Sequence, residues 1–426
     1  PVPFWSARDV AEAGRGSLFG GSEAEAVDEL DTILRDAIRL RMVADVPLGA
    51  FLSGGIDSSA VVALMQAQST RPVRTFSIGF HESGYNEAHH ARAVAQHLGT
   101  QHTELYVSSA EAIDVIPRLP LLYDEPFADP SQIPTYLVSQ LARQHVTVSL
   151  SGDGGDELFS GYNRYFWGRS LWSKMKWAPL SVRAAAARIL IRLASGRWQG
   201  GLESLQQFLP ARLRLPMLSD KLVKVANLLA LNSPEALYLS LVSSWKNPES
   251  VVIGGREAAT PLTDRSQWAE LEDFTERMMY LDTVTYLPED ILAKVDRASM
   301  GVSLEARVPL LDHRVVEFAW QVPLSMKLKG GQGKHLLRQV LYRYVPKAMM
   351  ERPKMGFGVP IGTWLRGPLR DWAEALLDEK RLKDEGYINP LPVRQLWLMH
   401  LSGEVNYQYH LWNILMFQTW LEQNGT

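Results

Sequence analysis

Apolar residues recur at helical spacing near the start of the chain and then alternate with short, continuous apolar runs. Between Glu25 and Met42 they follow a 3.6-residue period, which predicts a helix. Buried strands are predicted at 46–52, 73–80, 103–107 and 146–150. Helical patterns lie between them, at 58–68, 86–98 and 133–144. Strands that alternate with helices in this way are typical of right-handed βαβ units and a parallel sheet.

The rest of the chain has a different pattern, without clear strand signals. Past about Tyr165, amphipathic helical stretches rich in Trp, Leu and Arg continue to the end of the sequence. Residues 1–25 are rich in Gly, Ser and Pro, have no sustained period, and are predicted to be a linker or lead-in. We therefore predict one domain over 26–426, with an α/β core at about 26–165 and a mostly helical part at about 166–426.

Composition excludes several classes of protein. Hydrophobic residues make up 46% and charged residues 21% of the 426 residues, which is too apolar for a disordered chain. The net charge of −3 argues against bulk electrostatic binding to nucleic acid. The absence of cysteine excludes disulfides, thiolate metal sites and a cysteine nucleophile. With neither a targeting segment nor an apolar run of membrane-spanning length, a cytoplasmic chain with no membrane partner is expected.

One stretch departs from this near-neutral average. Between Arg164 and Lys224 basic residues far outnumber acidic ones, and arginine alternates with Leu and Ala at helical spacing. A nucleic-acid interface is one interpretation of this stretch. A solvated helix face, or a surface that meets an acidic partner domain, is the favoured one.

The first candidate site follows the first predicted strand, in the segment Leu52-Ser-Gly-Gly-Ile-Asp-Ser-Ser59. Two glycines allow a tight turn and a close approach of the backbone to a ligand. The helix that begins there offers N–H groups that suit phosphate. A carboxylate beside phosphates needs a divalent cation between them, so Asp57 implies Mg²⁺. The alternative is an ordinary turn with a helix cap, which the strand before it and the helix after it disfavour.

A second segment, from Ser149 to Tyr162, is rich in acidic residues and glycine and follows the strand predicted at 146–150. It should lie at the same carboxyl edge of the sheet as the first segment, where ligands of open α/β sheets bind. Its acidic side chains suit a second Mg²⁺ ligand and a general base. The alternative is a loop that only caps a helix.

Together these motifs resemble a known family. Ser53-Gly-Gly-Ile-Asp-Ser is similar to the pyrophosphate loop (PP-loop) of the N-type ATP pyrophosphatases. With Ser151-Gly-Asp-Gly-Gly-Asp-Glu-Leu it resembles the synthetase (C-terminal) domain of the glutamine-dependent asparagine synthetases. Further motifs of this family follow in order at Tyr123–Phe127, Asp129–Ser131, Lys294–Met300, Glu305–Asp312, Gly333–His335 and Arg352–Lys354. The resemblance implies an adenine nucleotide alpha hydrolase-like parallel sheet with flanking helices, followed by a large, mostly helical part.

The resemblance also implies roles for individual residues. Asp57 and Asp156 would bind the Mg²⁺ that bridges the phosphates of ATP. Lys334 and Lys354 would neutralise negative charge as pyrophosphate leaves, and Asp153, at a place that is often Glu, would guide or deprotonate the incoming amine. The pyrophosphate would be held by Ser53, Gly54, Gly55, Ser58 and Ser59. Adenosine and its phosphate would contact Leu52, Ile78, Ser151 and Gly152.

The implied reaction is ATP-dependent amidation of a carboxylate, with aspartate to asparagine favoured. The carboxylate would form an acyl-adenylate and release pyrophosphate, and ammonia would then release AMP and the amide. In the family, an N-terminal glutaminase domain with a catalytic cysteine supplies this ammonia, and no such domain is found in this sequence. We therefore expect a truncated two-domain protein rather than a stand-alone synthetase, with a glutaminase domain or subunit as partner. A homodimer is a further expectation for this chain.

Two other interpretations are weighed against this one. The first is an amidotransferase that acts on a sugar uronate or another carboxylate in polysaccharide or secondary metabolism. The related β-lactam synthetases close an internal amide and have tyrosine at the place of Asp153, so the aspartate favours external ammonia. The second is a non-catalytic regulatory homologue, which would have lost its glycines or Asp57, Asp156 and Lys354, and all of these are present.

Overall fold

The computed structural model describes residues 3–81, 86–194, 218–351 and 358–425. The chain divides into two compact units. The first contains Pro1–Tyr162, Ala258–Trp364 and Trp412–Thr426, and the second contains Asn163–Glu257 and Leu365–Leu411. The chain thus leaves the first unit close to the boundary predicted near residue 165. It later returns to that unit twice, which the sequence pattern does not predict.

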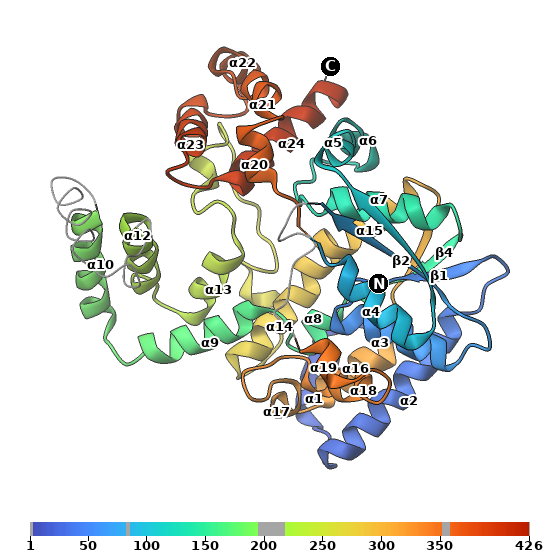
Figure 1. The fold of residues 1–426 in the computed structure, drawn as a ribbon. Coiled ribbons are helices and arrows are strands. Elements are labelled where there is room, and N and C mark those ends of the chain that lie inside the picture. Colours follow the sequence, from blue (N-terminus) through green and yellow to red (C-terminus); the bar gives the residue numbers. More distant parts are fainter. Residues whose placement is uncertain (1–2, 82–85, 195–217, 352–357, 426) are drawn as a thin grey trace, which may run out of the picture. The chain divides into compact units, whose positions relative to one another are not determined.

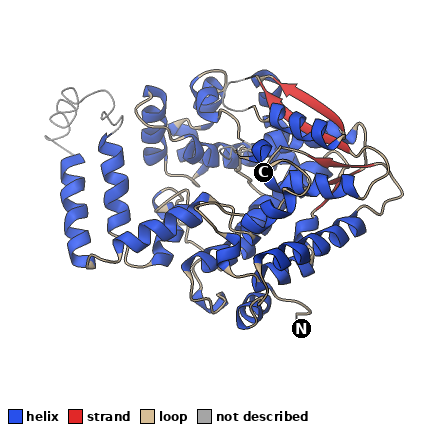
Figure 2. Cartoon of the chain, turned by 60° about the horizontal axis from the view of Figure 1, so that its bottom comes forward, coloured by secondary structure: helices blue, strands red, loops and turns tan. Residues whose placement is uncertain are grey.

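The first unit contains a five-stranded parallel sheet with the strand order β3-β2-β1-β4-β5 (Figures 1 and 2). The strands are β1 (Leu48–Phe51), β2 (Arg74–Phe80), β3 (Gln101–Val107), β4 (Val148–Leu150) and β5 (Glu305–Arg307). In the centre of the sheet, Ala50 pairs with Thr75 on one side and with Leu150 on the other. The predicted α/β fold with a parallel sheet and a helical remainder is therefore confirmed. The sequence pattern missed β5, because a three-residue strand without buried apolar side chains has no readable period.

Helices cover both faces of this sheet. The connections from β1 through β2 to β3 cross the sheet in one direction, and those from β3 through β4 to β5 cross it in the other. Right-handed crossovers therefore place the first two connecting helices on one face and the next two on the opposite face. The first two are α3 (Ile56–Ala67) and α4 (Ala88–Leu98), and the next two are α7 (Gln132–Arg143) and α15 (Ala293–Met300). On α3 pack α2 (Glu23–Arg41) and α18 (His335–Leu341), while α15 packs on α7.

The first unit contains further helices. They are α1 (Ala7–Gly16), α5 (Ser109–Ile113), α6 (Leu119–Leu122), α8 (Gly155–Leu158), α14 (Phe274–Val284), α16 (His313–Gln321), α17 (Leu324–Lys327) and α19 (Lys347–Met350). Single turns of other helix types are η1 (Ile116–Arg118), η5 (Arg265–Gln267), η6 (Leu287–Leu292) and η7 (Pro309–Leu311). Two helices, α20 (Ile361–Arg366) and α24 (Gln408–Asn424), include residues of both units.

A helix forms where the sequence predicted a linker. The helix α1 begins after Ser6, whose side chain accepts a hydrogen bond from the Asp9 N–H group. Its buried face consists of Ala11 and Gly14. A Cβ on Gly14 would lie 2.8 Å from the carbonyl carbon of Trp320, so glycine allows α1 to approach α16 closely. The sequence prediction did not include this helix, because the Gly, Ser and Pro content of residues 1–25 favoured a linker or lead-in.

The second unit is mostly helical. Its helices are α9 (Asn163–Met175), α10 (Leu180–Ala194), α12 (Leu218–Leu229), α13 (Pro234–Val242), η4 (Pro248–Ser250), α21 (Arg370–Leu376), α22 (Glu379–Glu385) and α23 (Pro390–Ser402). The helices α10 and α12 lie side by side (Figure 1). One arginine of the basic stretch is buried between them, since Arg183 donates to the carbonyl oxygens of Leu229 (3.2 Å) and Leu231 (2.8 Å). In the part of the chain that the structure describes, no helix is both long and apolar enough to cross a bilayer.

A lysine is buried in the first unit. The Lys327 side chain is 1% exposed, and its ammonium nitrogen lies 5.1 Å from the centre of the Trp320 ring. Burial lowers the pKa of Lys327 to about 8, although the negative charge of Glu276 opposes this shift. In the unfolded chain the same amine titrates near its ordinary value of about 10.4. Between these two values the unfolded state binds more protons, so the contribution of Lys327 to the free energy of unfolding rises with pH.

This shift makes a prediction for the variant Lys327→Met. The free energy of unfolding of the wild type, minus that of the variant, should rise by about 2–3 kcal/mol between pH 7 and pH 10, because one pKa unit corresponds to about 1.4 kcal/mol. Urea denaturation at both pH values measures this difference. The control is Lys329→Met, which removes a lysine that is 56% exposed in its side chain and should cost no more than about 1 kcal/mol at either pH. A flat difference for K327M would contradict the prediction.

Candidate active site at the carboxyl ends of β1 and β4

The two glycine-rich motifs lie at the carboxyl ends of β1 and β4, which are neighbours in the sheet. Connections leave these two strands in opposite directions, so this is the switch point at which open α/β sheets bind ligands. The segment 52–55 joins β1 to α3, and the segment 151–154 joins β4 to α8. The sequence prediction that both motifs share one edge therefore agrees with the topology.

The first loop is organised by its own serines. The Ser53 N–H group donates to the Ser58 hydroxyl (3.2 Å), and the Gly55 N–H group donates to the Ser53 hydroxyl (3.2 Å). Gly54 has a φ of +71°, and a Cβ at this position would lie 2.8 Å from the Ala91 nitrogen, so the turn requires glycine. The first turn of α3 follows directly, and the N–H groups at a helix start suit an anion.

The second loop packs directly on the start of α3. A Cβ on Gly152 would lie 2.6 Å from the Ser58 nitrogen and 2.8 Å from the Asp57 carbonyl carbon. A Cβ on Gly155 would collide with the Asp57 carboxylate, and one on Gly161 would collide with the side chains of Lys334 and Asp156. Glycine at these positions therefore leaves the space that the acidic side chains and the lysine occupy.

A buried lysine joins the two loops. The Lys334 ammonium donates to Oδ2 of Asp57 and to Oδ1 of Asp156, the latter at 2.9 Å. Burial alone would lower the pKa of Lys334, but the charges of Asp156 and Asp57 raise it above its ordinary value, so the amine stays charged. Lys334 has a φ of +59°, and its N–H group donates to the Phe159 carbonyl oxygen (2.7 Å). This hydrogen bond connects the residue before α18 to the residue that follows α8.

The Asp57 and Asp156 carboxylates fit a hard divalent cation. Both direct an oxygen toward the same cationic group, and Mg²⁺ prefers a few carboxylates together with phosphate oxygens. Among the residues that the structure describes, no group of three His, Asp or Glu side chains is arranged to hold a metal. Mg²⁺ binding here remains a proposal that rests on the chemistry of these two carboxylates.

The charges of two lysines act on the Asp153 carboxyl group. Burial raises the pKa of Asp153, and a hydrogen bond with Ser151 and the charges of Lys294 and Lys334 oppose this shift. A carboxyl group with a raised pKa is suited to exchange a proton with a neighbouring amine. The raised pKa agrees with the proton-exchange role that the family resemblance implies for Asp153.

A second buried ion pair, to which the sequence analysis assigned no role, lies beside Asp153. The Lys294 ammonium binds Oδ2 of Asp129 at 2.5 Å and lies 3.7 Å from Oδ1 of Asp290. Burial raises the pKa of Asp290 to about 7, and the charge of Asp129 adds to the shift. Lys294 and Asp129 both lie in motifs on which the family resemblance of the sequence rests. Their contact, across 165 positions of sequence, is evident only from the fold.

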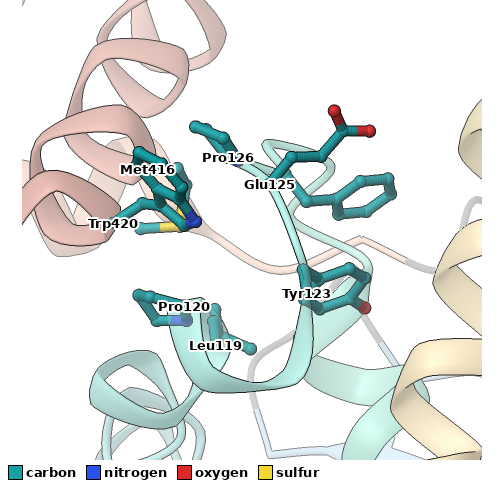
Figure 3. Close-up of a pocket in the computed structure, with 8 residues that line it drawn as sticks. Leu119, Pro120, Tyr123, Glu125, Pro126, Met416 and Trp420 are labelled. Atoms are coloured by element: carbon teal, nitrogen blue, oxygen red, sulfur yellow. The ribbon is translucent and has the colours of Figure 1, made fainter. Parts of the chain in front are cut away.

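A small pocket lies near this ion pair but contains none of the predicted site residues (Figure 3). It is lined by Leu119, Pro120, Tyr123, Glu125, Pro126, Phe127, Met416 and Trp420. The Tyr123 hydroxyl faces the Lys294 carbonyl oxygen at 3.5 Å, and the Tyr123 ring stacks on Phe127 at 4.5 Å. The pocket is mostly apolar and differs in character from the polar site at the strand ends.

The other predicted site residues are distributed as follows. Leu52 is buried directly after β1, and its N–H group donates to the Phe76 carbonyl oxygen of β2 (2.9 Å). Ile78 is buried within β2, and Ser59 within the first turn of α3. Lys354 lies outside the described residues. The structure thus brings together Asp57, Asp156 and Lys334, with Ser53, Ser58 and Gly152 beside them.

Fold and site define an α/β protein with a glycine-rich loop of the phosphate-binding kind at the switch point of a parallel sheet. The family model described as asparagine synthase matches residues 29–422, so the chain belongs to the asparagine synthase family.

Several named proteins are similar to this chain. "Asparagine synthetase [glutamine-hydrolyzing] 1" of Bacillus subtilis is 33% identical over 93% of this chain and 59% of its own length. A "Putative asparagine synthetase [glutamine-hydrolyzing]" of Mycobacterium tuberculosis is 33% identical over 92% of this chain and 57% of its own length. "Amidase chyE" of Penicillium rubens is 25% identical over 91% of this chain and 60% of its own length. The chain spans less than two thirds of the length of these relatives.

Proposed function

We propose that this chain carries out the ATP-dependent amidation of a carboxylate, with aspartate to asparagine as the favoured reaction. The observation that supports this most is the convergence of Asp57, Asp156 and Lys334 at the start of α3. This arrangement places positive charge, metal-binding oxygens and helix N–H groups where a pyrophosphate group could be bound and released. Membership of the asparagine synthase family agrees with this chemistry.

The first half of the reaction would use the loop after β1. The phosphates of ATP would bind to Ser53, Gly54, Gly55, Ser58 and Ser59. Asp57 and Asp156 would hold Mg²⁺, which when bound supplies positive charge beside the phosphate oxygens. The substrate carboxylate would attack the α-phosphorus, the bond to the bridging oxygen would break, and pyrophosphate would leave. Lys334, and Lys354 with it, would neutralise the charge that grows on the leaving group.

The second half of the reaction would use the loop after β4. Ammonia would attack the acyl carbon of the adenylate, the carbon–oxygen bond to AMP would break, and the amide would form. Asp153 would accept the proton that the nitrogen gives up, since burial raises its pKa toward that of a useful base. Leu52, Ile78, Ser151 and Gly152 would contact the adenosine and its phosphate. A glutaminase domain or subunit would supply the ammonia, and the homodimer belongs to the same proposal.

Amidation of a different carboxylate is the second candidate. It is favoured by the relative named "Amidase chyE", which aligns with 91% of this chain. The residues that handle ATP and ammonia would keep the same roles. Only the acceptor carboxylate would change, for example to a sugar uronate.

A panel of carboxylates separates these candidates. The chain is supplied with ATP, Mg²⁺ and ammonia, and formation of AMP and pyrophosphate is measured with aspartate, sugar uronates and other carboxylates. We expect turnover with aspartate, its abolition in Asp57→Asn, and its retention in Asp45→Asn, which alters an exposed aspartate that precedes β1. Turnover with a uronate and none with aspartate would establish the second candidate. The absence of AMP with every carboxylate would contradict both.

A further inference from the structure

One part of the basic stretch contains basic residues and no acidic ones. From residue 158 to residue 202 there are eight Lys and Arg residues and no Asp or Glu. They are Arg164, Arg169, Lys174, Lys176, Arg183, Arg188, Arg192 and Arg197. The rest of the chain contains 36 basic and 47 acidic residues, a net charge of −11. Positive charge is thus concentrated in one segment of an otherwise acidic protein.

Large apolar side chains are exposed within this segment. Trp167 on α9 is 71% exposed, and Trp177, in the turn between α9 and α10, is 86% exposed. On α10, Val182 and Ile189 are both 57% exposed and stand seven residues apart, on one face of the helix. Several large apolar side chains exposed within one short segment are typical of interaction sites.

The exposed basic residues lie on the same two helices and in the turn between them. Lys174 follows Trp167 by two helical turns on α9, and Lys176 directly precedes Trp177. Arg188 and Arg192 are exposed on α10 beside Ile189. None of these four basic side chains takes part in an ion pair within the described part of the chain. We call Trp167, Lys174, Lys176, Trp177, Val182, Arg188, Ile189 and Arg192 the basic aromatic surface.

The composition of this surface selects the class of partner. A second copy would bring like charges together, which disfavours symmetric self-association through this face. A nucleic acid would match the charge, but phosphates and base edges would leave the exposed Val and Ile in water. At an anionic lipid surface, Lys and Arg meet phosphate headgroups, Trp lies at the headgroup level, and aliphatic side chains reach the acyl boundary.

We propose that the basic aromatic surface binds the face of a membrane that contains anionic lipids, so that the chain attaches peripherally. This differs from the sequence expectation of a chain with no membrane partner, and from the favoured interpretation of the basic stretch as a solvated face or a surface for an acidic partner domain. The reason is that the exposure of Trp167 and Trp177 is evident only from the structure. The proposal is independent of the reaction proposed above.

Co-sedimentation with vesicles tests the proposal. The full chain is mixed with vesicles of 70% phosphatidylcholine and 30% phosphatidylglycerol, or of phosphatidylcholine alone, at low salt. We expect binding only to the vesicles that contain phosphatidylglycerol, and release at 0.5 M NaCl. Lys174→Glu with Lys176→Glu should weaken partitioning by at least about 30-fold, since each basic residue near an anionic surface contributes about fivefold. Trp167→Ala with Trp177→Ala should weaken it by about tenfold.

A matched variant controls for net charge. Lys380→Glu with Lys383→Glu makes the same change of charge on α22 of the same unit, at two exposed positions, and should leave partitioning within about twofold. An equal loss in this control would overturn the proposal, as would a wild type that does not bind the anionic vesicles. Binding to duplex DNA or RNA that K174E/K176E abolishes, without vesicle binding, would assign the surface to nucleic acid instead. Circular dichroism of each variant establishes that it is folded.

Discussion

Lys334→Met is expected to abolish AMP formation and to lower the free energy of unfolding by about 3–5 kcal/mol. The wild-type ammonium is buried and donates to both Asp57 and Asp156. Methionine fills a similar volume but carries no charge, so two neighbouring carboxylates lose the cation between them. Urea denaturation and AMP release measure the two effects on one preparation.

Two further variants identify the cause of this loss. Lys329→Met removes a lysine whose ion pair with Glu23 lies on the surface, and it should cost no more than about 1 kcal/mol. Adding Asp57→Asn to K334M removes one of the two opposed charges and should restore part of the stability, but not the activity. Mg²⁺ should stabilise K334M more than the wild type, because the carboxylates are then free to bind it. Full activity in K334M would contradict its assigned role.

Lys294→Met is expected to destabilise the first unit by about 3–5 kcal/mol through the second buried cluster. Lys294 is the cation between Asp129 and Asp290, and burial already raises the pKa of Asp290 to about 7. Without Lys294 the pKa of Asp129 should also rise above its value in the unfolded chain. The folded variant would then bind more protons than the unfolded one, so its penalty should shrink between pH 8 and pH 5.

A neighbouring residue on the same helix provides the control. Arg297→Met removes a half-exposed arginine that pairs with Asp124 at 2.5 Å, and its effect should stay below about 1 kcal/mol. The double variant Asp129→Asn with Lys294→Met should be more stable than K294M alone, because it removes the uncompensated charge. Equal stability of K294M and R297M would show that the buried ion pair stabilises the fold no more than the surface ion pair does.

Much of the α/β core could be predicted from local patterns. The runs 46–52, 73–80 and 146–150 contain β1, β2 and β4, and the run 103–107 covers β3 except for its first two residues. Side-chain periodicity is a local property, so it can be read from a few neighbouring residues. The glycine-rich loops could be located for the same reason, because each follows directly on a strand and leads into a helix.

Other elements were not predicted from local patterns. The strand β5 has only three residues, and its neighbour β4 lies more than 150 positions earlier in the chain. The helix α1 is amphipathic, but it is short, packs through Ala11 and Gly14, and lies in a segment whose Gly, Ser and Pro content favours a linker. The return of residues 258–364 and 412–426 to the first unit depends on packing between distant segments.

The sequence by itself therefore determined the parallel α/β core, the two glycine-rich loops and the acidic and basic residues from which the site is built. The tertiary structure alone decided which of these residues meet. Lys334 lies between Asp57 and Asp156, and Lys294 lies between Asp129 and Asp290. Local order follows from the spacing of neighbouring side chains, whereas these ion pairs form only after folding joins segments that are far apart and removes them from water.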